Sequence, residues 1–143
     1  MRPIRAYVDG SFKHSLGRIG WAVVVVTETD EWDIVWAKLS GELQDAPKGV
    51  MDQRNIAAEL KAAMMAAAWA KENEVEVVVV HDYKGIGCWP KGEWTPKNRW
   101  TRRYCRYMKE NEYVVGYEWV EAHSGDRYNE MADRLAKRAI EAG

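Results

Sequence analysis

Four acidic side chains stand where they can do chemistry together: Asp9, Glu59, Asp82 and Asp133. Asp9 and Asp82 end predicted strands. Glu59 lies near the start of a predicted helix, and Asp133 lies in the first turns of the last one. Ligands gather at the carboxyl edge of α/β sheets, so all four side chains can converge there. Like charges in one pocket repel and burial raises their pKa values, so the cluster requires cations to neutralise it.

The ligand types limit the chemistry of such a site. Oxygen-only ligands at an open, wet edge select Mg²⁺ or Mn²⁺ rather than zinc. The sequence offers no Ser or Cys nucleophile paired with a base. The reaction that fits is metal-assisted attack of water on a phosphodiester.

Each acid also has a simpler interpretation when taken alone. Asp9 precedes a glycine, a pair that is common in hairpin turns. Asp82 suits the N-cap of a following helix. Glu59 and Asp133 are compatible with solvated charges on helix surfaces. The hypothesis of a metal site therefore depends on the order of the four acids and their shared edge, not on any one of them.

The stretch from Val75 to Asp82 predicts a central strand. It is β-branched at nearly every position and has no polar alternate from Val77 to Val80. This pattern is typical of a strand covered on both faces, which is usual for parallel pairing. Asp82 is therefore expected at a carboxyl end.

Three more strands are expected before this one. Residues 4–9 predict a strand that ends in a turn at Asp9-Gly10-Ser11. Residues 21–27 and 32–39 are rich in Val, Trp and Ile and predict an antiparallel hairpin beside the first strand. The polar residues 28–31 connect them, and residues 43–52 predict a loop.

Helical periodicity begins after this loop. Residues 55–71 predict a helix whose buried stripe contains Ile56, Leu60, Ala63, Met64 and Ala67. A helix between two strands is typical of a crossover connection with parallel pairing. The rest of the chain predicts a short helix over 83–89, a helix over 97–110, a strand over 113–120 and a helix over 127–141.

The helix over 97–110 is expected to carry one cationic face, formed by arginines at i, i+3, i+4 and i+7. These residues, called here the arginine face, are Arg99, Arg102, Arg103 and Arg106. Nucleic-acid phosphates are the expected partner, and an ordinary solvated helix face is the alternative. Trp89, Trp94 and Trp100 are candidates for stacking against a sugar, with core packing as the alternative.

Composition bounds the class of protein. The chain has 143 residues, which predicts one domain over 1–143, and 21 basic against 22 acidic residues exclude a uniformly basic surface. Cys88 and Cys105 indicate neither a zinc site nor a disulfide framework, so a reducing, cytoplasmic setting is expected. No signal core is present, and the longest apolar run, residues 21–26, is too short to span a bilayer. We expect a soluble, free-standing monomer without membrane partners.

Several motifs together resemble those of type 1 ribonucleases H. These motifs are Tyr7-Val8-Asp9-Gly10-Ser11, Asn55-Ile56-Ala57-Ala58-Glu59-Leu60, the strand end His81-Asp82, and His123-Ser124-Gly125-Asp126-Arg127-Tyr128-Asn129-Glu130-Met131-Ala132-Asp133. The resemblance covers essentially the whole chain. The last motif is the most specific, because it sets a His, an Asn and an Asp at fixed spacing across a loop and a helix start.

The resemblance implies an α/β, RNase H-like fold: a five-stranded mixed sheet, first three strands antiparallel and last two parallel, with helices on both faces. It also implies hydrolysis of the RNA strand of an RNA/DNA hybrid, leaving a 5′-phosphate and a 3′-hydroxyl. Two Mg²⁺ ions, or Mn²⁺ as a substitute, would serve this reaction. By analogy Asp9 would bridge both ions, and Glu59 and Asp82 would hold the one nearer the leaving oxygen. Asp133 would hold the ion that activates water.

The resemblance also implies further site residues. His123, on a glycine-flanked loop, would assist water positioning or product release, and an ordinary surface histidine is the alternative. Gly10, Ser11 and Asn55 would read 2′-hydroxyls in the wide, shallow minor groove of a hybrid. Ser11 and Asn55 also suit a turn and a helix cap. Asn129 and the arginine face complete the implied substrate contacts.

Three features depart from the family pattern. Residues 12–20 lack the dense glycine run of bacterial members, and Tyr83 and Lys84 follow Asp82 where many members carry Ser and Gln. Residues 90–97 are too short for the basic handle with which some members grip the DNA strand, so that grip is expected to be weaker or to shift to Lys91, Lys97 and the arginine face. A non-catalytic hybrid-binding module, or an RNase H-like nuclease acting on another nucleic acid, stays open as an alternative.

Overall fold

The computed structural model shows a mixed sheet with helices on both faces. It describes residues 2–13, 17–43 and 54–141, without the side chains of residues 54 and 55. Its elements are β1 (Ile4–Lys13), β2 (Arg18–Glu28), β3 (Asp33–Glu42), α1 (Arg54–Asn73), β4 (Val77–His81), α2 (Gly85–Cys88), α3 (Arg99–Glu110), β5 (Val114–Trp119) and α4 (Arg127–Glu141). The predicted order of strands and helices is confirmed. The predicted loop over 43–52 falls almost wholly outside the described residues.

The five strands lie in the order β3-β2-β1-β4-β5. β1, β2 and β3 pair antiparallel, whereas β4 pairs parallel with both β1 and β5. Both the mixed sheet and the interior position of β4 were predicted. The apolar run of β4 is explained by this position, because a strand between two neighbours and between two helical layers has no wet face.

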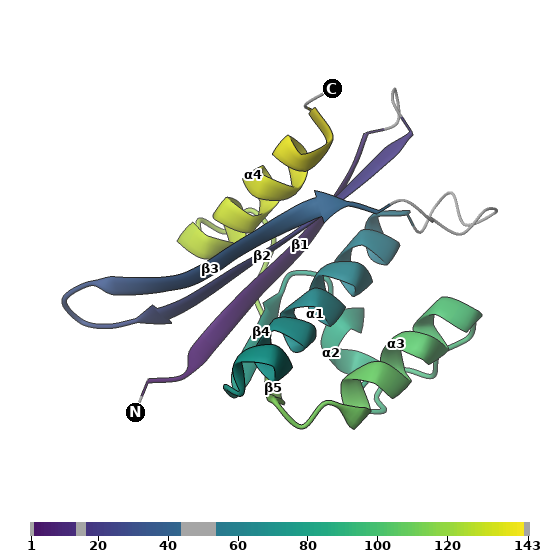
Figure 1. Ribbon diagram of the computed structural model, residues 1–143. Coiled ribbons are helices and arrows are strands. Elements are labelled where there is room, and N and C mark those ends of the chain that lie inside the picture. Colours follow the sequence, from purple (N-terminus) through teal and green to yellow (C-terminus); the bar gives the residue numbers. More distant parts are fainter. Residues whose placement is uncertain (1, 14–16, 44–53, 142–143) are drawn as a thin grey trace.

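The two faces of the sheet carry separate cores. α1, α2 and α3 cover one face, where Leu60 and Tyr104 pack with Val8 and Val23. α4 covers the opposite face (Figure 1). On that face Tyr128 packs against Tyr7. The helices therefore approach the sheet from both sides, and an acid on α1 and an acid on α4 can reach the same edge between them.

The prediction that the first strand ends in a turn at Asp9-Gly10-Ser11 is wrong. β1 continues to Lys13, and Asp9 pairs with Ala22 of β2. The parallel pairing of β1 with β4 stops at Tyr7, opposite Val80. Asp9 is thus at a sheet edge because β4 ends beside it, not because β1 ends. β2 pairs with β1 from Arg5 to Lys13, so an Asp-Gly pair does not interrupt the strand.

Gly10 is required for close packing instead of a turn. A Cβ at this position would lie 2.5 Å from Ala58 Cβ, far inside van der Waals contact. Small residues on both elements therefore let α1 approach β1 at this level. Ala57 and Ala58 are both buried, and Glu59 follows them directly on α1.

The predicted hairpin is present with longer arms than the sequence indicated. β2 begins at Arg18 and β3 extends to Glu42, and an ion pair with Arg18 Nη2 at 2.6 Å from Glu42 Oε1 joins these ends. Within the described ranges, no helix combines the length and apolarity needed to cross a bilayer.

Candidate active site

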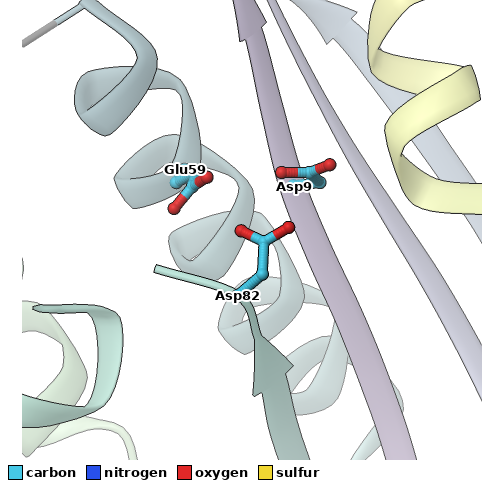
Figure 2. Close-up of side chains that lie close together, drawn as sticks. All are labelled: Asp9, Glu59 and Asp82. Carbon is cyan, nitrogen blue, oxygen red and sulfur yellow. The ribbon is translucent and has the colours of Figure 1, made fainter. Parts of the chain in front are cut away.

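Three carboxylates from three elements meet at the end of β4. Asp9 comes from the middle of β1, Glu59 from the second turn of α1, and Asp82 directly follows β4. One oxygen from each lies within 4.8 Å of the others. Figure 2 shows the three side chains turned toward one another across the gap between α1 and the sheet. The predicted convergence of these acids is a feature of the fold.

Asp133 joins the same pocket from α4, on the other side. The pocket holds about 330 Å³ and is lined by all four predicted acids. Asp133 is not within the tight group of three, and its Oδ2 lies 2.9 Å from Lys137 Nζ. The site therefore has two parts: a compact group of three acids and a fourth acid with its own cation.

Burial and mutual repulsion disturb the ionisation of the three grouped acids. Burial first, and then the charge of Asp82, raises the pKa of Asp9 to about 8. Burial, followed by the charges of Asp82 and Asp9, raises the pKa of Glu59 well above its ordinary value. Hydrogen bonds to Asp82 and Asp9 add to this rise in the pKa of Glu59. Without a cation, three adjacent carboxyls cannot all ionise.

Asp82 is held by neighbours on both sides. Burial raises its pKa, while hydrogen bonds from Glu59 and Asn129 oppose the rise. Asn129 is itself buried, at 3 % exposure, on the first turn of α4. The Asp82 backbone carbonyl accepts a hydrogen bond from Trp119 Nε1 at 3.0 Å. The backbone of Asp82 is therefore held from β5 and its carboxylate from α4.

His81 anchors the turn that follows Asp82. Its Nδ1 lies 2.9 Å from the carbonyl oxygen of Tyr83, so this nitrogen carries the proton and donates it. Burial lowers the pKa of His81 to about 4, so the ring is neutral at ordinary pH. A Cβ at Gly87 would lie 2.9 Å from His81 Nε2, which explains a glycine at that position.

The donor set fits a hard divalent cation. Glu59 Oε2 is buried and has no hydrogen-bond partner among the described residues. A buried, unpaired oxygen beside two other carboxylates is a group that a cation would satisfy. The grouped ligands are all oxygens, which suits Mg²⁺ or Mn²⁺ and does not suit zinc.

The other predicted site residues fall into three groups. Gly10, Ser11, His123 and Asn129 all line the pocket of the four acids. Asn55 lies in the first turn of α1, and its side chain is outside the described set. The four arginines lie elsewhere, exposed on α3, and none lines this pocket.

Lys137 lines this pocket and was missed by reasoning from the sequence. Its spacing of four residues from Asp133 on a predicted helix was a usable signal, because such pairs face each other. Phe12 and Glu130 also line the pocket and were missed. Phe12 had no signal, since the strand was expected to end before it.

A second pocket has three aromatic side chains in its wall. It holds about 470 Å³, and Tyr83, Trp89, Trp94, Lys97 and Thr101 are in its wall. The Tyr83, Trp89 and Trp94 rings contact one another at centroid distances of 5.5 to 6.0 Å. We call it the aromatic pocket. Its residue Tyr83 follows Asp82 of the acidic pocket directly in the chain.

Known proteins of similar sequence cover nearly the whole chain. The family model described as RNase H matches residues 2–141. A Ribonuclease HI of Xylella fastidiosa is 33% identical, over 96% of this chain and 91% of its own. A Ribonuclease H of Neorickettsia sennetsu is 29% identical, over 92% of this chain and 89% of its own.

Solved structures share the fold at lower identity. RNase H1 of Halobacterium salinarum superposes with a TM-score of 0.74 at 20% identity, covering 96% of this chain and 97% of that one. The N-terminal RNase H domain of a Mycobacterium tuberculosis protein gives 0.75 at 22% identity, covering 98% and 94%. LC11-RNase H1, solved in complex with an RNA/DNA hybrid, gives 0.72 at 20% identity, covering 96% of each chain. With a family match over residues 2–141, a sheet of the predicted order and an acidic pocket at its edge, the chain belongs to the ribonuclease H family and is an enzyme of that family.

Proposed function

We propose that this ribonuclease H hydrolyses the RNA strand of RNA/DNA hybrids and leaves a 5′-phosphate and a 3′-hydroxyl. The observation that carries the proposal is the meeting of Asp9, Glu59 and Asp82 within 4.8 Å, with one Glu59 oxygen buried and unpaired. The hybrid bound to LC11-RNase H1, a protein of the same fold, supports this substrate.

The four acids would hold two Mg²⁺ ions. Asp9 would ligate both, Glu59 and Asp82 would complete the first site, and Asp133 would complete the second. Bound there, the ions would lower the pKa of a water molecule and offset negative charge on the scissile phosphate. Such ions would lower the raised pKa values of Asp9 and Glu59, because a cation favours the ionised carboxylate.

Other side chains of the pocket would orient these acids and the substrate. Asn129 holds the Asp82 carboxylate in place through its amide. Lys137 compensates the charge of Asp133. His123 lies on the pocket rim in a left-handed backbone conformation, with φ of 57°, from which it would move a proton at the water or at the product.

Selection of the RNA strand would come from residues on the rim of the acidic pocket, where they would face the minor groove of the hybrid. Gly10 and Ser11 line the pocket beside Asp9, where small polar groups and backbone amides can meet 2′-hydroxyls. Asn55, on the first turn of α1, would add to this reading. The aromatic pocket, whose residue Tyr83 follows Asp82 in the chain, would receive the sugar of the uncut strand against Trp89 and Trp94.

One assay tests the proposal. The chain and its Asp9→Asn variant are incubated with matched hybrid, duplex RNA, duplex DNA and branched DNA in Mg²⁺, then in Mn²⁺. We expect cleavage of the hybrid alone, with 3′-hydroxyl ends that a polymerase extends, and a loss of at least about 100-fold in the variant. Cleavage of another substrate in preference, or an equally active variant, would refute it. Circular dichroism of the variant separates lost chemistry from lost folding.

A further inference from the structure

The hairpin of β2 and β3 exposes several large apolar side chains to water. Ala37 and Leu39 of β3 still pack against the main core, but nearer the hairpin connection this cover ends. The exposed residues there, called here the hairpin patch, are Trp32 (64% exposed), Ile34 (38%), Val35 (43%) and Trp36 (52%). Figure 1 shows the connection of β2 and β3 projecting past the helices. Large apolar side chains that are exposed in one place mark a site of interaction.

The hairpin patch covers both faces of β3. Val35 pairs with Val26, which belongs to the core beneath α4, so Val35 lies on the α4 side. Ile34 pairs with Thr27 and therefore turns to the opposite face. Trp36 lies there too, because its Nε1 donates to Thr27 Oγ1 at 2.9 Å. A helix laid on one face would leave the other face exposed, whereas an extended segment along the outer edge of β3 covers parts of both.

The outer edge of β3 is open to such a segment. β3 comes first in the order β3-β2-β1-β4-β5, and no strand within the described ranges pairs with its outer side. The unpaired N–H and C=O groups of an edge strand are a template for another extended chain, and short length, proline or lysines usually protect them. β3 has ten residues, no proline and one lysine, Lys38. Its edge is therefore suited to pairing.

The surroundings of the hairpin patch are acidic. Residues 27–37 contain no lysine or arginine and four acids, which are Glu28, Asp30, Glu31 and Asp33. Arg2 pairs with Asp30, and Arg127 approaches Asp33 only to 3.9 Å. Glu31 takes part in none of the ion pairs found in the described part of the chain. The hairpin therefore repels polyanions and also a second copy of itself, whereas it attracts a basic partner.

A pocket beside the hairpin patch has the chemistry to receive a cationic side chain. It holds about 420 Å³ between the hairpin connection and the start of α4, with Trp32, Tyr128, Glu31 and Asp33 in its wall. The Tyr128 hydroxyl donates to Asp33 Oδ2 at 2.5 Å and so fixes that carboxylate. The Arg127 guanidinium already lies over the Tyr128 ring, 5.4 Å from its centroid. Aromatic rings and carboxylates together favour a lysine or arginine side chain.

We propose that the hairpin patch and the outer edge of β3 form a docking site for a basic, extended segment of another protein. The backbone of the segment pairs with β3, its apolar side chains cover the hairpin patch, and its lysines or arginines meet Glu31 and the pocket beside it. This pocket shares no lining residue with the carboxylate pocket, so the docking does not depend on the proposed function.

The probe for this site is a labelled peptide of about eight residues that alternates lysine and valine. One control peptide carries serine in place of valine, and the other carries glutamate in place of lysine. Binding to the whole protein is measured by fluorescence anisotropy. We expect the Lys-Val peptide to bind at least about tenfold more tightly than either control, because docking requires both the apolar and the cationic side chains.

Matched variants locate the bound peptide. Val35→Ser alters the hairpin patch, and Val115→Ser alters a similarly exposed valine on β5, at the opposite edge of the sheet. Glu31→Lys reverses one charge at the hairpin, and Glu112→Lys reverses an exposed charge before β5. We expect the Lys-Val peptide to bind at least about fivefold more weakly to Val35→Ser and tenfold more weakly to Glu31→Lys. Both controls should bind like the parent, and thermal unfolding should be equal in all four variants because the altered side chains are exposed.

Hydrogen exchange distinguishes backbone pairing from contact with side chains alone. The bound Lys-Val peptide should slow the exchange of β3 amides that otherwise face solvent. Unchanged exchange, equal binding of the three peptides, or equal losses in the hairpin and control variants would overturn the proposal. A dimer of the parent that Val35→Ser dissociates would also overturn it and assign the surface to a second copy. Binding of the parent to phosphatidylserine vesicles that Val35→Ser abolishes would overturn it in favour of a membrane.

Discussion

Gly10 and Glu59 are so close that a Cβ at Gly10 would lie 2.8 Å from the Glu59 backbone nitrogen. The missing side chain on β1 therefore sets the distance between strand and helix at the level of the acids. Asp9 precedes Gly10, so the same contact controls how near Asp9 comes to Glu59.

Gly10→Ala should push α1 away from β1. Overpacking of a filled site costs about 1–3 kcal/mol, and a displacement of a fraction of an ångström separates the metal ligands. We expect hydrolysis to fall at least about tenfold and the Mg²⁺ requirement to rise, measured as rate against Mg²⁺ concentration. Gly116→Ala is the control, because its Cβ would meet only Val78 at 3.7 Å. Equal effects of the two substitutions would contradict the argument.

Stability should depend on pH through the grouped acids when no metal is added. Asp9 has a folded pKa raised to about 8, whereas unfolded aspartate titrates near 4. The folded state then binds more protons between these values. Its stabilising contribution is complete below pH of about 4 and is lost as pH rises through about 8. In EDTA we expect the free energy of unfolding to fall over this range.

Asp9→Asn removes the contribution of Asp9 to this dependence and supplies the matched control. At pH about 8 in EDTA the variant should be more stable than the parent, by at least about 2 kcal/mol. Millimolar Mg²⁺ should stabilise the parent and have little effect on the variant. Denaturant unfolding at several pH values measures both. A parent that becomes more stable between pH of about 5 and 8 in EDTA would be inconsistent with the buried cluster.

Asn129→Ala should weaken the metal site without touching a ligand directly. It removes the donor that orients the Asp82 carboxylate, and loss of such partners usually costs about 10- to 100-fold in metal affinity or activity. We expect the half-saturating Mg²⁺ concentration for hydrolysis to rise by at least about tenfold. Asn73→Ala, which removes an exposed amide at the end of α1, should leave it unchanged. An unaltered Mg²⁺ curve for Asn129→Ala would show that Asp82 is oriented by other groups.

Tyr104→Phe should test how α3 is attached. The hydroxyl is buried and bonded to Ile86, so its removal leaves a carbonyl unpaired, at a cost of about 1–3 kcal/mol. Thermal unfolding should shift down by about 2–8 °C. Tyr107→Phe on the same helix is the control, since no hydrogen bond of its hydroxyl is found within the described residues. Equal unfolding temperatures of the two variants would rule out the predicted role.

Element types could be inferred from the sequence because their causes are local. The valine run of β4 and the alanine-rich period of α1 each repeat over a few residues, and a period requires no knowledge of the rest of the chain. The order of the acids, together with the last motif, indicated the family. Boundaries were less certain: Asp9-Gly10 has the chemistry of a turn, and only the pairing with β2 makes it a strand interior.

The site itself depended on contacts between distant segments. No local pattern shows that β4 ends beside Asp9, that Asn129 bonds to Asp82, or that the arginine face lies outside the acidic pocket. By itself the sequence determined which elements form and which residues can do the chemistry, because periodicity and residue type are properties of neighbours along the chain. Only the tertiary structure decided which acids are buried together and which cations stay apart, because distances and desolvation arise from packing between segments far apart in sequence.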